Sequence, residues 1–488
     1  MIAIVNRRSV TSGARDNLNR LFTWSICWIL LPNAAFMWLW IIGAPPRYSE
    51  IITGGAIGLI VRNARYPIRL AAFVLLMIYS ALSFVAALFN FRVSSLIESL
   101  SFLIEMRPES SIEYYWGAVA LIVTLLAGAR LLRMRTDFRG NWAIIAAIAI
   151  TACLAGLDAL LSLSTSGAYQ RATADGAPFD SGVRRSGFAS QPDGRRDLIL
   201  VIVESLGQPH DPATAARLIE RWKRADIAAR YDFTQGTAPY FGSTTSAEMR
   251  ALCGRWGNYA EVMEKRDKGC LPARLRKAGY ATLALHSFDG AFFDRARWYP
   301  NMGFERRLFR DDLIRRGAAS CPGVFPGACD RDVPGIIYRE LKADPRPQFI
   351  YWLTVNSHLP VPISEALNTG TCRADLPDEV RRFPMLCRQF ALWLEIEERL
   401  AEQMTKPDFP DADILLVGDH MPPYFDGAQR SQFDPENVPW MLLRRKTAPG
   451  RGLQHRQYFA TANDPPRTGH AAPLSPARIA KPVAQRFP

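Results

Sequence analysis

The sequence lacks the signs of a disordered chain and of a nucleic-acid-binding protein. Its 488 residues are 49% hydrophobic, and the chain is long enough for more than one domain. The net charge of +13 comes from Arg and Lys residues in short clusters or scattered singly, with no interleaved aromatic residues that could stack bases. We therefore expect no nucleic-acid partner.

Long apolar runs are missing after Leu163, and this absence divides the chain into two unlike halves. A helix that crosses a bilayer needs about 20 apolar residues. Four runs in the first half are long enough: Leu21–Ile42, Ile68–Phe91, Tyr115–Leu132 and Trp142–Leu163. No small-residue cleavage pattern follows the first run, so we expect an anchor that is kept and not a cleaved signal peptide.

A fifth stretch, Tyr48–Val61, is short and rich in glycine. Cytoplasmic loops carry an excess of Lys and Arg. The Arg-rich segments 7–20, 62–69 and 130–139 fall on one side of the membrane only if this stretch also crosses it. The pattern predicts a five-helix transmembrane domain over residues 1–163 with its amino terminus inside; the alternative is that Tyr48–Val61 is a re-entrant or interfacial piece.

Only two of the eight cysteines, Cys27 and Cys153, lie in the predicted spans. An even number of cysteines in an exported domain predicts disulfides. Six cysteines allow fifteen pairings, of which short loop closures favour Cys253 with Cys270, Cys321 with Cys329, and Cys372 with Cys387.

The second half is predicted to consist of a linker (164–196), a globular domain (197–443) and a basic, mostly disordered tail (444–488). Continuous apolar runs typical of buried parallel strands occur at Asp197–Val203, Tyr280–Leu285, Phe349–Val355 and Ile414–Val417. Helix-like segments such as Thr214–Ala225 and Pro272–Lys277 separate the runs, so we expect a doubly wound α/β sheet in an extracytoplasmic domain.

Each predicted strand ends in a polar cluster, and ligands of open α/β sheets bind at the carboxyl ends of strands. The clusters are Glu204-Ser205, His286-Ser287, Asn356-Ser357-His358 and Gly418-Asp419-His420. Glu204, Asp419 and His420 form a set suited to one divalent cation, zinc or manganese, with a fourth position open. The hydroxyl-rich turn Phe241–Arg250 could fill that position with a threonine nucleophile, although such a turn is by itself most simply a helix N-cap.

These residues resemble the alkaline-phosphatase-like (sulfatase-like) superfamily, in the branch of the phosphoethanolamine transferases and the lipoteichoic-acid-synthase-type phosphoglycerol transferases. The resemblance covers the five-span anchor and nearly all of the globular domain. It implies the metal ligands and the nucleophile, which are Glu204, Thr244, Asp419 and His420. Thr244 is preferred to Thr245 as the nucleophile because the family motif has a glutamate four residues later, where this chain has Glu248.

The resemblance also implies substrate-binding residues. In the segment from His286 to Arg295, these two residues match a histidine and an arginine that hold the substrate phosphate, and Phe293 stands where an aromatic residue is common. His358, in Asn-Ser-His-Leu-Pro, resembles the histidine that meets the leaving or accepting oxygen, and an imidazole there suits a general acid.

Three short motifs leave the reaction open. Cys321–Pro334 resembles the disulfide-bearing stretch of phosphoethanolamine transferases, whereas Gly418–Pro422 and the Glu248 spacing resemble the phosphoglycerol type. Cys270-Leu-Pro-Ala-Arg274 matches the pattern from which sulfatases make their formylglycine nucleophile, so a sulfatase stays an alternative.

Together these features predict an enzyme of the bacterial inner membrane with a periplasmic catalytic domain. We expect it to transfer a phospholipid head group, phosphoethanolamine in preference to phosphoglycerol, to an envelope glycan or lipid through a phospho-threonine intermediate. The alternatives are a membrane-tethered phosphodiesterase or sulfatase that uses water, and a scaffold protein without activity.

Overall fold

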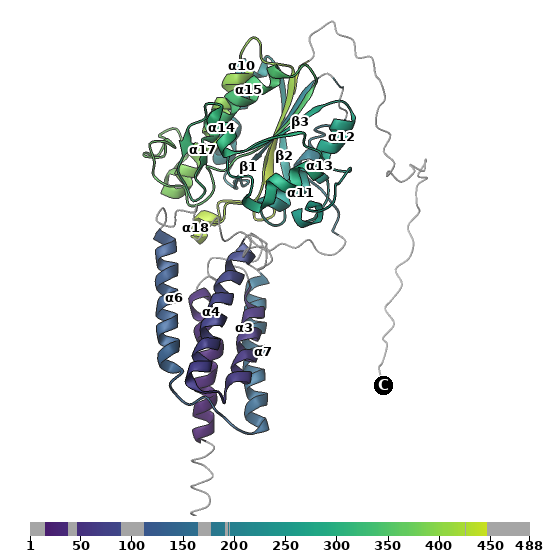
Figure 1. The fold of residues 1–488 in the computed structure, drawn as a ribbon. Coiled ribbons are helices and arrows are strands. Elements are labelled where there is room, and N and C mark those ends of the chain that lie inside the picture. Colours follow the sequence, from purple (N-terminus) through teal and green to yellow (C-terminus); the bar gives the residue numbers. More distant parts are fainter. Residues whose placement is uncertain are drawn as a thin grey trace, which may run out of the picture. The chain divides into compact units, whose positions relative to one another are not determined.

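The computed structural model describes residues 15–37, 46–88, 112–163, 177–190, 194, 196–424 and 426–446. Up to residue 163 the described chain is helical, and from residue 177 it forms an α/β domain (Figure 1). The expected tail beyond residue 446 lies outside the described residues.

Helices occur at all five predicted positions of the first half. The first is helical from residue 15 and includes the π-helix η1 (Ile26–Leu30) and α2 (Leu31–Met37). The others are α3 (Tyr48–Val61), α4 (Tyr66–Leu88), α6 (Ile112–Leu131) and α7 (Asn141–Leu163). Within the described residues, two stretches are long and apolar enough to cross a membrane, Tyr66–Ala86 and Asn141–Leu161, so the five-span topology stays a prediction.

The glycines of α3 are explained by close helix packing. A Cβ atom on Gly58 would lie 2.4 Å from Cγ of Trp28, and one on Gly55 would lie 2.6 Å from Oγ1 of Thr151 in α7. Small residues at such contacts let helix backbones approach closely. The 14 residues of α3 rise about 21 Å, which is less than the ~30 Å of bilayer hydrocarbon.

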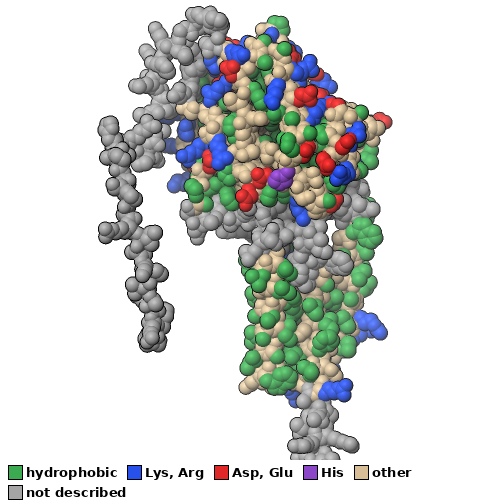
Figure 2. Space-filling view, turned by 180° about the vertical axis from the view of Figure 1, so that it is seen from behind, with side chains coloured by type: hydrophobic (Ala, Val, Ile, Leu, Met, Phe, Trp, Pro, Cys, Tyr) green, Lys and Arg blue, Asp and Glu red, His purple; other side chains and the backbone are tan. Residues whose placement is uncertain are grey.

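Apolar side chains cover the outside of this helical part. Figure 2 shows hydrophobic side chains over its visible face, with Lys and Arg toward one end. Ile60, Leu75 and Trp116 are examples, each more than 60% exposed. A surface of this kind is expected where helices face lipid.

The α/β domain is built on a seven-stranded sheet in the order β2-β9-β8-β1-β7-β3-β4. Its parallel strands are β1 (Asp197–Val203), β3 (Ala281–His286), β4 (Arg306–Leu308), β7 (Gln348–Leu353) and β8 (Ala412–Gly418). Two antiparallel strands complete the sheet, β2 (Tyr231–Pro239) and β9 (Asn437–Arg445). The four strands that the apolar runs predict are confirmed within a few residues, and β1 has exactly the predicted bounds.

Helices lie on both faces of the sheet (Figure 1), as a doubly wound fold requires. The α-helices after β1 are α9 (Pro212–Ile219), α10 (Ala225–Ala228), α11 (Thr244–Cys253), α12 (Leu271–Lys277), α13 (Arg295–Met302), α14 (Arg310–Arg315), α15 (Val333–Ala343), α16 (Asp378–Arg381), α17 (Pro384–Met404) and α18 (Gly427–Arg430). Four short 3-10 turns are η5 (Arg221–Lys223), η6 (Tyr259–Val262), η7 (Phe292–Asp294) and η8 (Asp330–Asp332). A small hairpin pairs β5 (Ser320–Cys321) with β6 (Gly327–Ala328).

Part of the predicted linker belongs to the domain instead. Residues 177–190 include α8 (Gly182–Arg185), whose N-cap Ser181 accepts a hydrogen bond from the amide of Arg184. Phe188 is buried in the core of the α/β domain. The sequence did not reveal this segment as part of the domain because it has few apolar residues. Burial of Phe188 and the helix N-cap Ser181 hold it in place.

All three expected disulfides are confirmed: Cys253–Cys270, Cys321–Cys329 and Cys372–Cys387. Cys27 and Cys153, in the helical first half, are free. Each bridge closes a loop of 8 to 17 residues, which limits the freedom of the unfolded chain.

The buried Asp197, at the start of β1, predicts a pH-dependent stability. Burial raises the pKa of its carboxyl to about 7, although it accepts a hydrogen bond from the amide of Gln348. The unfolded chain ionises this group near pH 4, so the unfolding free energy should fall as pH rises from about 4 to about 7. Asp197→Asn should remove that loss and raise the melting temperature at pH 8 by about 2–4 °C or more. Thermal unfolding of the purified protein tests this, with the partly exposed Asp332→Asn as control, and an unchanged pH profile for Asp197→Asn would contradict it.

Candidate metal and nucleophile site

The sheet topology brings three of the predicted ligands together. β1 and β8 are neighbouring parallel strands, with Val203 in register with Gly418. Glu204 follows β1, and Asp419 and His420 follow β8, so all three emerge at the same edge of the sheet. β7 and β3 lie next in order, and they bring His358 and His286 to that edge.

The side chains of these ligands surround the hydroxyl of Thr244. Its Oγ1 lies 2.9 Å from Oδ2 of Asp419, 3.2 Å from Oε2 of Glu204 and 3.4 Å from Nε2 of His420. Thr244 is the first residue of α11 and is partly exposed, whereas Thr245 is buried. The geometry favours Thr244 over Thr245 as a group that meets substrate.

The electrostatics of this cluster suit a divalent cation. The ligand atoms of Glu204, Asp419 and His420 all lie within 4.8 Å of one another. Burial, followed by the charge of Glu204, raises the pKa of Asp419 to about 7. Two carboxylates that oppose each other in a buried place are stabilised by a positive ion, and two oxygens with one imidazole nitrogen suit zinc or manganese.

His420 is oriented for ligation through Nε2. Its Nδ1 lies 2.9 Å from the carbonyl oxygen of Met421, which is the partner expected when Nδ1 carries the proton. Burial lowers the pKa of His420, but the carboxylates of Asp419 and Glu204 more than offset this and raise it above its ordinary value.

Ser205, which the sequence reasoning did not single out, ties the two carboxylates together. Its amide donates a hydrogen bond of 2.7 Å to Oδ1 of Asp419, and its hydroxyl donates one of 2.8 Å to Oε1 of Glu204. To do so it takes a left-handed backbone conformation with φ of 55°. Such conformations cost free energy in a residue other than glycine and gather at functional sites.

The backbone of Glu204 is also fixed from two further elements. Its amide donates to Oγ1 of Thr354, and its carbonyl oxygen accepts from Oγ of Ser357 at 2.7 Å and from Nε1 of Trp393 at 3.2 Å. Trp393 belongs to α17, which has no counterpart among the predicted helices. These contacts fix the backbone of Glu204, and nothing in the spacing of these residues indicated them.

Arg250 adds a positive charge beside the cluster. This residue lies on α11 and is buried. Its Nη2 donates a hydrogen bond of 2.8 Å to the carbonyl oxygen of Asp419. Burial lowers the pKa of Arg250 to about 10, so the side chain stays charged at neutral pH. Arg250 therefore offsets part of the negative charge of the two carboxylates.

Arg295, which was expected to bind the substrate phosphate, is paired with a carboxylate in this structure. Nε and Nη2 of Arg295 lie 3.1 and 2.8 Å from Oε2 of Glu248, in a buried ion pair, and Nη1 donates to the carbonyl oxygen of Phe292. Tyr299 and Tyr351 also donate to Glu248. A role of Arg295 in phosphate binding stays a prediction. The presence of Glu248 four residues after Thr244 is explained by its ion pair with Arg295.

His286 and Phe293 lie close to Arg295. The guanidinium carbon of Arg295 is 5.1 Å from the centre of the Phe293 ring, and both side chains are buried. Nε2 of His286 is buried and has no hydrogen-bond partner among the described residues, while its Nδ1 lies 3.3 Å from the carbonyl oxygen of Leu353. Burial and the charge of Arg295 lower the pKa of His286 well below its ordinary value.

His358 interacts electrostatically with Glu204 and His420 of the cluster. Its Nδ1 lies 2.7 Å from the carbonyl oxygen of Leu359, which is the partner expected when Nδ1 carries the proton. Burial lowers the pKa of His358.

The formylglycine motif is not the nucleophile of this domain. Cys270 is buried in the disulfide with Cys253 and stands at the N-cap of α12, so its sulfur is not available for conversion. The match of Cys270–Arg274 to the sulfatase pattern is therefore explained by a disulfide followed by a helix with proline near its start.

Comparison with known proteins identifies the family of the α/β domain. The family model for sulfatases matches residues 196–444, which is half of the chain. A protein of Rhizobium meliloti (strain 1021), named as a putative cyclic beta-1,2-glucan modification protein, is 28% identical over 288 residues. That match covers 53% of this chain but only 43% of the relative.

Two solved structures are also similar. Lipoteichoic acid synthase LtaP of Listeria monocytogenes has 19% identity and a TM-score of 0.40, over 54% of this chain and 70% of that one. Phosphoglycerol transferase GacH of Streptococcus pyogenes has 18% identity and a TM-score of 0.36, over 53% and 72%. On the family match, the chain belongs to the sulfatase family, within the alkaline-phosphatase-like superfamily.

The cluster predicts a specific loss of cation affinity when a ligand is changed. Glu204→Gln, Asp419→Asn or His420→Ala should each weaken Mn²⁺ or Zn²⁺ binding at least about 100-fold, since even the loss of a residue that supports a ligand costs 10- to 100-fold. Isothermal titration calorimetry of the full chain measures this. Asp197→Asn is a matched control, because it removes a buried carboxylate at the opposite end of β1. Equal affinity in the ligand variants and the control would contradict the site.

Proposed function

We propose that this protein transfers phosphoethanolamine from a phospholipid to an envelope glycan or lipid, through a phospho-threonine on Thr244. The observation that supports it is the position of the Thr244 hydroxyl, which contacts Glu204, Asp419 and His420 at the carboxyl edge of the sheet. A hydroxyl among divalent-metal ligands is the arrangement in which an alcohol becomes a nucleophile near neutral pH.

A zinc or manganese ion held by Glu204, Thr244, Asp419 and His420 would lower the pKa of the threonine hydroxyl and offset the charge of the phosphoryl group. The other contributions come from the chain. α11 begins at Thr244, so the positive end of the helix dipole lies at the nucleophile, where it favours an anionic phosphoryl group. Arg250 adds a fixed positive charge next to Asp419.

The exchange has two steps that return the enzyme to its starting state. In the first, Oγ1 of Thr244 loses its proton to solvent and bonds to phosphorus, the bond to the diacylglycerol oxygen breaks, and protonated His358 gives that oxygen a proton. In the second, the acceptor hydroxyl gives its proton to His358 and attacks phosphorus, and the threonine oxygen leaves and regains a proton. The lowered pKa of His358 favours the neutral form that the second step requires, and it makes the protonated form a stronger acid in the first step.

Different features support the two substrates. The apolar helices of the first half would hold the enzyme in the inner membrane, where a phospholipid donor lies, with the α/β domain in the periplasm. The curated relative is named for glucan modification, which supports a glycan as acceptor. The resemblance of Cys321–Pro334 to phosphoethanolamine transferases favours that donor, and phosphoglycerol is the alternative.

Intact-mass analysis after exposure to phospholipid tests the intermediate. The wild-type protein should gain the mass of one phosphoethanolamine group on Thr244, and a phosphoglycerol mass would identify the other donor. Thr244→Ala should carry no adduct and should lose at least about a thousandfold of transfer activity. Thr245→Ala is the matched control, because the neighbouring threonine is buried. An adduct that persists in Thr244→Ala would exclude this nucleophile.

Transfer and hydrolysis are separated by the fate of the acceptor. A strain that lacks this protein should lose a substituent from an envelope glycan or lipid, and mass spectrometry of these fractions detects it. If the envelope is unchanged while the purified protein releases free phosphoethanolamine, water is the acceptor and the protein is a phosphodiesterase.

A further inference from the structure

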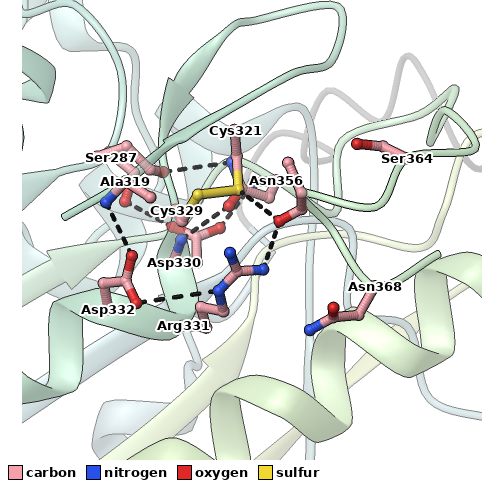
Figure 3. The surroundings of a disulfide bond; sticks show 12 residues. Ser287, Ala319, Cys321, Cys329, Asp330, Arg331, Asp332, Asn356, Ser364 and Asn368 are labelled. Carbon is pink, nitrogen blue, oxygen red and sulfur yellow. Dashed lines mark hydrogen bonds and ion pairs between the residues drawn. A yellow bond between two sulfur atoms is a disulfide. The ribbon is translucent and has the colours of Figure 1, made fainter.

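The hairpin β5/β6, closed by the disulfide Cys321–Cys329, packs against the segments that follow β3 and β7. Figure 3 shows the disulfide beside Ser287, Asp330 and Asn356. The amide of Ala328 donates a hydrogen bond of 2.8 Å to the carbonyl oxygen of Ser287, the residue after β3. A Cβ atom on Gly327 would lie 2.4 Å from that same oxygen and 3.0 Å from Cγ1 of Val355. The hairpin therefore contacts the segments after both β3 and β7 at a place where no side chain fits.

Asp330 follows the disulfide directly and binds to both segments. Its Oδ1 accepts from the hydroxyl of Ser287 at 2.5 Å, and its Oδ2 accepts from the amides of Val355 and Asn356 at 2.9 and 2.7 Å. Its own amide donates 2.7 Å to Oδ1 of Asn356. Since the amide of His358 donates to the carbonyl oxygen of Val355, Asp330 fixes the turn that carries His358.

Phe325, inside the loop closed by Cys321–Cys329, touches the imidazole itself. Its ring is 4.6 Å from that of His358, edge to face at 82°. Phe325 is buried with Phe288, Val324 and Val355 in a small apolar cluster that is separate from the main core. An edge-to-face contact of this kind fixes the tilt of a ring.

We infer that the hairpin β5/β6, its disulfide Cys321–Cys329, Phe325 and Asp330 together position His358 for proton transfer to and from the reacting oxygens. This inference rests on the role of His358 in the proposed function. None of these residues is proposed to touch the substrate. Phe325 fixes the tilt of the His358 ring, and Asp330 fixes the backbone of the turn that carries His358. The disulfide holds both residues near the ends of β3 and β7.

Such a role predicts a loss that depends on the leaving group. A diacylglycerol oxygen is a poor leaving group and needs a proton, whereas p-nitrophenolate leaves without one. A misplaced His358 should therefore slow the first step, measured as a single turnover, far more with a phospholipid than with bis-p-nitrophenyl phosphate. General unfolding would slow both reactions equally.

The test compares five variants of the full chain in detergent, loaded with Mn²⁺, on these two substrates. His358→Ala sets the size of the effect, expected at about 100-fold or more on the phospholipid. Phe325→Leu and the pair Cys321→Ser/Cys329→Ser should show about a tenfold loss on the phospholipid and less than about a twofold loss on the nitrophenyl ester. Pro322→Ala, at a partly exposed residue outside the apolar cluster, is the control within the loop, and Cys372→Ser/Cys387→Ser is the matched disulfide control; both should retain activity on both substrates. Mn²⁺ affinity should stay unchanged in all five variants.

The outcomes separate the two proposals. If His358→Ala shows the leaving-group dependence and the loop variants do not, or if the Cys372/Cys387 pair behaves like the Cys321/Cys329 pair, the positioning role is overturned while the proposed function stands. If His358→Ala slows the first step equally with both substrates, the role of His358 as proton donor in the proposed function is wrong and the positioning role is overturned with it. Rescue by Phe325→Tyr, which keeps the ring, supports the edge-to-face contact as the cause.

Discussion

The site depends on two carboxylates that are held close together away from water. Glu204 and Asp419 both lie within hydrogen-bonding distance of the same threonine hydroxyl, and both are buried. Their mutual repulsion is opposed by the amide and hydroxyl of Ser205, by the nearby charge of Arg250, and by the cation that such a set of donors attracts. Most of the local structure serves to keep these two groups at this distance.

The backbone after β1 and at the end of β8 allows the two carboxylates to lie close together. Ser205 takes a left-handed conformation just after β1, and Gly418 ends β8 at a point where a Cβ atom would lie 1.9 Å from the carbonyl oxygen of Leu206. The two strand ends therefore approach more closely than side chains would permit. Gly418 at the end of β8 and the strained Ser205 after β1 let Asp419 and Glu204 meet, and the stability of the surrounding sheet offsets the strain.

The sequence was most informative where burial is complete. β1, β3, β7 and β8 are buried on both faces, so they read as continuous apolar runs, and the residues after their ends could be placed at one edge of the sheet. Most residues of β2 are exposed or half-buried, and the strand contains Gly236 and ends at Pro239, so it gave no such pattern. β9 was partly assigned to the tail, because its last residues are basic.

The grouping of Glu204, Asp419 and His420 was predictable from their positions after the strands, but their partners were not. Nothing in the spacing of Glu248 and Arg295 shows that they form an ion pair, because 47 residues separate them and two tyrosines complete the arrangement. The same holds for Trp393, whose indole reaches Glu204 from a helix 189 residues later in the chain. Long-range hydrogen bonds of single side chains leave no periodic trace in a sequence, whereas strands and helices do.

The distribution of the cysteines has a consequence for how the protein matures. All three bridges lie in the α/β domain, and the two free thiols lie in the helical first half. One bridge joins α11, which carries Thr244, to α12. Another closes the hairpin β5/β6, which contacts the segment that carries His358. Oxidant supply in the compartment where this domain folds would thus govern how much competent enzyme accumulates, so the same polypeptide made among reducing thiols would have the right sequence and lack its cross-links.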